Sequence, residues 1–172
     1  VSFACPWAHR CLIVRTLKEL ESAVTVSAVS PLMLSRGWSF DTDTGSDGDP
    51  LYDADYLSEL YVRHDTEYTG RVTVPLLWDK SSGCIVNNES ADILRILNSD
   101  FAGVAGNDLD FYPPSLRADI DHVNERVYET VNNGVYRCGF ATEQTPYERA
   151  FDALFDSLDW LDNRLQAQRF LV

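Results

Sequence analysis

The feature that most constrains the fold of this chain is a change of pattern past its middle. Up to residue 102, short stretches with strand character alternate with helical stretches, whereas beyond residue 115 only helical periodicity is found. Between these parts, Gly103, Gly106 and Pro113-Pro114 interrupt a polar stretch that is typical of a linker. We therefore expect an α/β domain over residues 1–102, a linker over 103–114 and a helical domain over 115–172.

Turn residues and apolar spacing predict the elements of the first part. Pro6 suits the first position of a helix, because its missing amide would have no partner there. The expected elements are strands over 1–3 and 25–29, a helix from Pro6 to about Glu21, a long loop over 35–55, a short helix over 56–61, a hairpin of strands over 72–79 and 84–86, and a helix that opens at Glu89-Ser90.

The second part shows two helical stripes. One begins at Leu116 and is expected to stop at Asn132-Asn133-Gly134, and the other follows Pro146 and continues to Leu165. Trp160 falls opposite the second stripe, where it would be left in water unless more chain covers it. Since the first residue is also Val1 and not Met, we expect a chain truncated at both ends, with any targeting peptide upstream.

Composition argues against several classes of function. With 14 basic and 27 acidic residues, the net charge of -13 repels nucleic acids and anionic membrane surfaces. The apolar runs are far shorter than the roughly 20 residues that span a bilayer. The four cysteines show neither C-x-x-C nor metal-ligand spacing, so we expect no disulfide scaffold and no metal site.

Cys5 is the strongest candidate for a nucleophile. It precedes Pro6 at a strand-to-helix junction, where unpaired amides and the helix dipole favour a thiolate. Ala8 stands where a dithiol oxidoreductase has its second cysteine, so an external thiol such as glutathione would have to release a mixed disulfide. Cys11 and Cys84 fit core positions. Cys138 falls in an expected Gly-flanked loop, and the sequence assigns it neither a core position nor a reactive role.

Two further pairs each have two interpretations. Val74-Pro75 fits the cis proline that faces the nucleophile in thioredoxin-like folds, and equally a trans proline at a sheet edge. Ser90 and the free amides of its helix start could bind a carboxylate, with Glu89 available for an ammonium group. Simple helix capping explains the same pair.

Six segments, in this order, resemble the glutathionyl-hydroquinone reductases, the Xi class of glutathione transferases. They are CPWAHR at 5–10, RGW at 36–38, YLSELY at 56–61, GRVTVPLLWD at 70–79, NNES at 87–90 and NGVYRCGFA at 133–141. The resemblance covers nearly the whole chain. The first segment, which begins CPWA, is less specific by itself, because Omega-class relatives have similar cysteine motifs.

The resemblance implies a thioredoxin-like domain followed by an all-α glutathione-transferase C-terminal domain, incomplete in this chain. It implies glutathione as co-substrate and a cytoplasmic enzyme that forms a homodimer at full length. Cys5 would take glutathione from a glutathionyl-hydroquinone as a mixed disulfide, and a second glutathione would release it. The implied glutathione contacts are Trp38, Arg71, Val74, Glu89 and Ser90, and Tyr136 would face the aromatic substrate.

Two other functions fit the same residues. An Omega-like thioltransferase or dehydroascorbate reductase would apply the Cys5 chemistry to another electrophile. The other function is a non-catalytic scaffold with the glutathione-transferase fold. Such a scaffold would not need a thiol next to its glutathione contacts, so the presence of Cys5 together with Trp38, Glu89 and Ser90 argues against it.

The acidic residues generate a prediction about salt. The chain has 18 Asp to 9 Glu and 12 Arg to only 2 Lys, a surface of short, hydrated carboxylates that suits a salty cytoplasm. Self-repulsion of this charge acts over a Debye length of about 30 Å at 0.01 M salt and roughly 3 Å at 1 M. We expect thermal melts between about 0.05 and 2 M KCl to show a rising Tm, most steeply at low salt. A flat or falling Tm would instead indicate an ordinary acidic protein.

Overall fold

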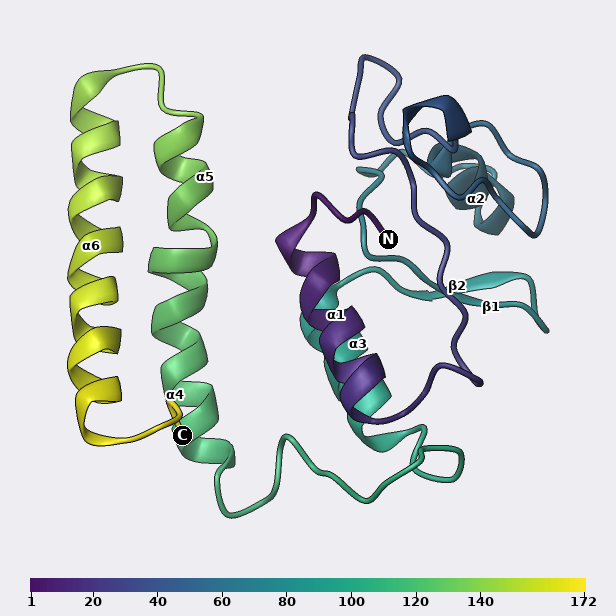
Figure 1. The fold of residues 1–172 in the computed structure, drawn as a ribbon. Helices are drawn as coiled ribbons and strands as arrows, with labels where there is room; N and C mark the ends of the chain where they lie inside the picture. Colours follow the sequence, from purple (N-terminus) through teal and green to yellow (C-terminus); the bar gives the residue numbers. More distant parts are fainter. The chain divides into compact units, whose positions relative to one another are not determined.

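The structure, a computed structural model, describes residues 1–172 and divides into two compact units, Val1–Phe111 and Tyr112–Val172 (Figure 1). The first unit combines helices with a small sheet and the second is helical, so the predicted order of α/β and helical parts is confirmed. None of the helices combines the length and the hydropathy that a membrane-spanning helix needs. The elements are α1 (Pro6–Leu17), the 3-10 turn η1 (Thr42–Thr44), α2 (Leu57–His64), β1 (Leu77–Asp79), β2 (Cys84–Asn87), α3 (Ser90–Ser99), α4 (Arg117–Val127), the π-helical turn η2 (Tyr128–Asn132), α5 (Gly134–Gly139) and α6 (Gln144–Ala167).

Helix α1 ends at Leu17 and not near Glu21 as predicted. Glu19 there takes a left-handed φ of 55°, and the Leu20 amide donates back to the Arg15 carbonyl at 2.9 Å, as in a Schellman ending. Helical periodicity alone does not detect this turn, since it needs no glycine here. The turn buries Leu20 in a cluster between α1 and α3, which also contains Cys11, Ile93 and Leu97.

The strands predicted over 1–3 and 25–29 are absent. The two stretches share backbone hydrogen bonds of 2.8 and 2.9 Å but form no ladder. Ala28 shows why: its amide donates to the Asp47 carboxylate at 3.0 Å and its carbonyl accepts the Ser46 hydroxyl at 2.7 Å. Two side chains of the long loop, and the Asp47 amide at 3.0 Å from the Ala28 carbonyl, thus take the backbone groups that a sheet would pair.

The predicted hairpin is confirmed as an antiparallel pair of β1 and β2. Its first strand, however, begins at Leu77 and not at residue 72. Pro75 has no amide to donate, and the amide and carbonyl of Thr73 bond to the Tyr61 hydroxyl at 3.3 and 2.8 Å in place of a neighbouring strand. The segment before β1 is therefore irregular chain, held at Thr73 by the Tyr61 side chain.

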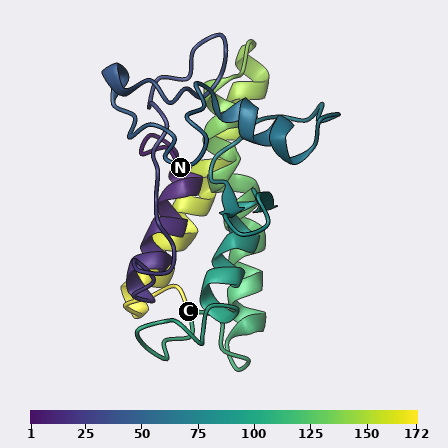
Figure 2. The same ribbon diagram turned by 90° about the vertical axis from the view of Figure 1, so that its right-hand side faces the viewer.

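A second core fills the space between α2, the hairpin and the long loop. Figure 2 shows α1 and α3 side by side, with α2 and the loop near one end of the pair. The loop predicted over 35–55 has only the short η1 turn as regular structure. This core contains the buried residues Val29, Phe40, Ala54, Leu57, Leu60, Tyr61 and Val74.

The stretch 103–114 was predicted as a linker. Within it, the Gly106 amide donates to the Lys18 carbonyl at 3.1 Å, and the Phe111 amide to the Asn98 side chain at 2.8 Å. Residues up to 111 thus contact the first unit, and the linker boundaries stay a prediction.

In the second unit, the helical chain continues through Asn132-Asn133-Gly134, where a stop was predicted. The Asn133 amide donates to the Tyr128 carbonyl at 3.0 Å, a bond of π-helical spacing, and the Arg137 amide returns to the Asn133 carbonyl at 3.0 Å. The wider π-helical turn accommodates Asn132, Asn133 and Gly134, which are poor helix formers, and the chain continues as a helix. Cys138 consequently lies in α5 and not in a Gly-flanked loop.

Helix α6 buries only part of its apolar stripe. Phe151, Phe155 and Leu158 of the stripe are 38%, 45% and 38% exposed, whereas Leu154 of the same stripe is buried, as is Ser157 beside it. Tyr147, Phe151 and Phe155 stack successively along the exposed face, with ring centroids 5.8 and 4.2 Å apart. The aromatic part of the stripe is therefore not a contact between helices of this unit, whereas Leu154 is, since it faces Gly134 of α5.

Polar side chains also join α6 to α4 and η2. The buried Ser157 hydroxyl accepts from Arg126 at 3.0 Å and from the Thr130 hydroxyl at 2.7 Å. Trp160, predicted on the solvent side, is half-buried, and the guanidinium groups of Arg126 and Arg164 lie 4.8 and 5.7 Å from its ring centre. Cation-π contacts cover this tryptophan in part.

The burial of Leu20 predicts a large effect on stability. Replacing Leu20 with Ala should lower the free energy of unfolding by about 2–5 kcal/mol, because the side chain is fully buried and leaves a cavity. Leu17→Ala, the same substitution at the 45% exposed end of α1, should cost less than about 1 kcal/mol. Denaturant titrations measure both. Equal losses would contradict the observed end of α1.

Candidate functional site

Cys5 occupies the N-cap of α1, the position expected from the sequence. Its backbone is extended, with φ of -99° and ψ of 114°, and its carbonyl accepts the His9 amide at 3.0 Å. Pro6 begins the helix, and no side chain caps the first turn. The half-buried sulfur therefore lies at the positive end of the helix dipole, among uncapped amides.

The Cys5 sulfur faces the backbone of Val74. Its thiol donates to the Val74 carbonyl with a Sγ to O distance of 3.5 Å. The Val74-Pro75 peptide is cis, which answers the question that the sequence left open. Because the Val74 side chain is buried in the core, only the backbone of this residue can serve a ligand beside the sulfur.

Glu89 and Ser90 form the start of α3. Glu89 is the N-cap, and its carboxylate accepts the Ala91 amide at 3.1 Å, so the capping interpretation is confirmed. Asn87 in turn accepts the Glu89 amide at 2.6 Å. The Glu89 side chain nevertheless stays 54% exposed, while Ser90 is buried. A carboxylate and a hydroxyl thus lie together at a helix start, with one of them open to solvent.

Arg10 completes this group, although its role is not predicted by the sequence. Its Nε and Nη2 donate to the Ser90 hydroxyl at 3.2 and 2.6 Å, and Nη2 lies 3.7 Å from a Glu89 carboxylate oxygen. The guanidinium lies 4.9 Å from the ring centre of Trp7. The sequence signal that could have identified Arg10 is its place on the helix that begins at Cys5. This helix, α1, packs against α3.

Trp38 lies near the same core. It is half-buried and packs against the cluster that contains Val74, as does Cys5. The Trp38 carbonyl accepts the amide of Leu57, the first residue of α2, at 2.9 Å. This bond connects the long loop to the core beneath the Cys5 sulfur.

Two predicted residues are less closely connected to the group. Arg71 has an exposed side chain, and its carbonyl accepts the Tyr68 hydroxyl at 2.7 Å. Tyr136 belongs to the second unit, where its 37% exposed ring stacks on Phe140 with centroids 6.3 Å apart. Cys5 and Val74, by contrast, are in direct contact, and Glu89 and Ser90 both contact Arg10.

The other cysteines have different surroundings. Cys11 is buried, as predicted, and burial raises the pKa of its thiol to about 11. It therefore stays protonated at neutral pH and is a poor nucleophile. Cys84 lies half-buried in β2 and Cys138 half-buried in α5. Of the four, Cys5 is the cysteine at a helix start.

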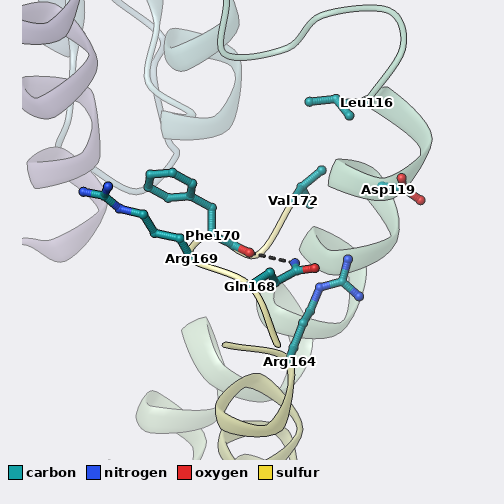
Figure 3. A pocket seen from close by; sticks show the side chains of 7 residues that line it. All are labelled: Leu116, Asp119, Arg164, Gln168, Arg169, Phe170 and Val172. Atoms are coloured by element: carbon teal, nitrogen blue, oxygen red, sulfur yellow. Dashed lines mark hydrogen bonds between the residues drawn. The ribbon is translucent and has the colours of Figure 1, made fainter. Parts of the chain in front are cut away.

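A cavity of about 310 Å³ lies elsewhere, in the second unit (Figure 3). Across it, the Gln168 amide donates to the Phe170 carbonyl at 2.7 Å. It contains no cysteine and none of the predicted site residues, so we do not assign the candidate site there. Its lining residues are Leu116, Asp119, Arg164, Gln168, Arg169, Phe170 and Val172.

Known proteins resemble this chain in sequence over most of its length. Residues 4–100 match the family described as "Glutathione S-transferase, N-terminal domain". Glutathionyl-hydroquinone reductase PcpF of Sphingobium chlorophenolicum is 53% identical over 170 residues, which cover 99% of this chain and 54% of that protein. The chain spans about half the length of the curated relatives it matches.

Solved structures agree in fold. The glutathione-bound structure of YqjG, a glutathione transferase homolog from Escherichia coli K-12, matches with a TM-score of 0.96 and 51% identity over 99% of this chain and 56% of that chain. Glutathione transferase Xi 1 from Trametes versicolor matches with a TM-score of 0.96 and 50% identity over 100% of this chain and 61% of that one. These matches confirm the thioredoxin-like domain followed by a helical glutathione-transferase domain. The chain therefore belongs to the glutathione S-transferase family, and within it the similarity is to the Xi class and its glutathionyl-hydroquinone reductases.

Proposed function

We propose that this protein uses glutathione to reduce glutathionyl-hydroquinones, with Cys5 as the only nucleophile. One observation carries the proposal: the Cys5 sulfur lies at the N-cap of α1, 3.5 Å from the Val74 carbonyl, and the residue three positions later is the buried Ala8. A single thiol at a helix start supports a mixed disulfide that an external thiol resolves. The similarity to named glutathionyl-hydroquinone reductases supports the substrate class.

In the first step, the Cys5 thiolate attacks the glutathione sulfur of the substrate. An S–S bond forms while the bond between that sulfur and the ring carbon breaks. The electron pair of the broken bond and one proton go to the ring carbon, which leaves as part of the free hydroquinone. The ring carbon is thereby reduced, and Cys5 is oxidised to a mixed disulfide with glutathione.

In the second step, the thiolate of another glutathione attacks the glutathione sulfur of this mixed disulfide. Glutathione disulfide leaves, and the Cys5 thiolate is regenerated. One glutathionyl-hydroquinone and one glutathione are thus converted to one hydroquinone and one glutathione disulfide. The second glutathione supplies the remaining reducing equivalents, so no other reductant is required.

We assign the binding of glutathione to the first unit. The Val74 backbone pairs with the tripeptide backbone next to the sulfur. Ser90 and the positive charge of Arg10 bind the γ-glutamyl carboxylate, and the open carboxylate of Glu89 binds its ammonium group. Trp38 and Arg71 complete the site, by packing and by charge respectively.

We assign the aromatic part of the substrate to Tyr136, whose partly exposed hydroxyl can donate to a phenol oxygen. A cytoplasmic location and a homodimeric assembly belong to the same proposal. They follow from the resemblance to the family.

The mechanism predicts that only one cysteine is essential. Cys5→Ser should lower glutathionyl-hydroquinone reductase activity by at least about a thousandfold, because serine cannot form the mixed disulfide. Mass spectrometry after exposure to the substrate should show a glutathione adduct on Cys5 of the unmodified protein and none on the variant. Cys138→Ser, in α5, is the matched control and should keep most of the activity. Equal losses in both variants would exclude the monothiol mechanism.

The same assays separate the reductase from its alternatives. A quinone adduct on Cys5, in place of glutathione, would indicate a transferase. Turnover of dehydroascorbate without turnover of a glutathionyl-menadiol-type substrate would indicate an Omega-like enzyme.

The α3 start predicts a defect in glutathione binding. Ser90→Ala should raise the KM for glutathione about tenfold, because it removes a buried hydroxyl from the carboxylate site and leaves Arg10 without its closest acceptor. Steady-state kinetics with varied glutathione measure the change. Ser99→Ala, at the exposed end of the same helix, is the control and should leave KM unchanged. A KM for Ser90→Ala equal to that of the control would remove Ser90 from the binding site.

A further inference from the structure

We propose that Tyr61 is a positioning residue for glutathione, whose buried hydroxyl holds together the two chain segments that we assign to opposite parts of the tripeptide. The inference rests on the proposed function, because it uses the assignment of Val74 and Glu89 to glutathione. Tyr61 itself lies in α2 and is not proposed to touch the ligand.

The Tyr61 side chain has a fixed place in the core. It is 1% exposed and belongs to the same cluster as Val74, and its ring packs on Tyr68 with centroids 4.9 Å apart. A buried hydroxyl needs partners within the protein, because water cannot replace them. Its hydrogen bonds are therefore a constraint on whatever surrounds it.

All the bonding capacity of this hydroxyl is used by two segments. It donates to the Thr73 carbonyl at 2.8 Å and accepts the Thr73 amide at 3.3 Å and the Asn88 side-chain amide at 3.2 Å. One donor and two acceptor positions are thus filled. Asn88 also donates to the Thr73 hydroxyl at 3.2 Å, which closes the connection between the two segments.

These bonds lie directly beside the predicted glutathione contacts. Thr73 precedes Val74, so fixing both polar groups of Thr73 orients the Val74 peptide that faces the Cys5 sulfur. Asn88 precedes Glu89, the N-cap of α3. The Tyr61 hydroxyl thereby sets the spacing between the backbone site and the γ-glutamyl site.

No strand ladder performs this task in its place. Strand β1 begins at Leu77 and β2 ends at Asn87, so residues 73 and 88 both lie outside the sheet. Since a fixed spacing matters for a ligand that bridges the two segments, we expect loss of the hydroxyl to weaken glutathione binding more than it weakens the chemistry at Cys5.

Tyr61→Phe tests the proposal, because it removes the hydroxyl and keeps the ring. We expect the KM for glutathione to rise about five- to tenfold while kcat at saturating glutathione stays within about twofold. The rate of Cys5 alkylation by iodoacetamide, which needs no glutathione site, should not change. Hydrogen exchange should become faster at the amides of residues 73–74 and 88–89.

Leu20→Ala is the control for stability alone, since Leu20 belongs to the other core cluster. It should lower Tm without raising the KM for glutathione. A rise in KM that is equal in Leu20→Ala and Tyr61→Phe would overturn the positioning role, as would an unchanged KM in Tyr61→Phe.

A second variant keeps the proposal testable if Tyr61→Phe does not fold. Asn88→Ala removes one bond to the hydroxyl at a half-buried position, and we expect a smaller rise in KM with kcat retained. An unchanged KM in that variant would overturn the inference. Failure of the proposed function gives a different result: the unmodified protein would then bind no glutathione, whereas the exchange rates would still respond to Tyr61→Phe.

Discussion

The first unit depends on a few side chains that satisfy backbone groups outside its sheet. Backbone amides and carbonyls in a protein interior must find partners, and β1 and β2 are short strands that provide few. Tyr61 does this for Thr73, and Asp47 and Ser46 do it for Ala28. The path of the chain around the Cys5 sulfur is thus fixed by hydroxyls and carboxylates more than by a ladder.

This arrangement leaves backbone free at Val74, where the proposed function places the glutathione backbone. Because the Val74 segment bonds to Tyr61 on one side, it is held without a neighbouring strand and can offer its edge next to the Cys5 sulfur. Two helix starts, those of α1 and α3, meet this segment and supply uncapped or partly capped amides. Rigid support and an accessible edge are then compatible, which a complete sheet would not allow.

The cation at the candidate site is opposite in sign to the net charge of the whole chain. A net charge of -13 would repel the two carboxylates of glutathione, so the proposed binding requires local positive potential. Arg10, beside Ser90 and Glu89, provides a cation in that place, and the helix dipoles add to it. The carboxylate of Glu89 keeps Arg10 oriented and leaves an acceptor for an ammonium group.

The sequence by itself was sufficient for the division into an α/β and a helical part, for the hairpin and for the position of Cys5 at a helix start. Each of these depends on local features such as Pro6 before apolar periodicity or a polar turn between strands, and local features are visible in a sequence. Recognition of the family added the set of predicted glutathione contacts. Its motifs occur in the expected order over nearly the whole chain.

Tertiary structure decided what local pattern cannot express. The strand over 25–29 was lost because Asp47 and Ser46, distant in sequence, bond to Ala28, and the stop at Asn132-Asn133-Gly134 was overridden by a π-helical turn that packs on α6. Arg10, Tyr61 and Asn88 lie within the family motifs, but their roles depend on partners 12 to 80 residues away, which the motifs do not reveal. The stripe of α6 predicted the burial of Leu154 but not of Ser157, which makes a polar contact with Arg126 and Thr130 that hydrophobic periodicity cannot detect.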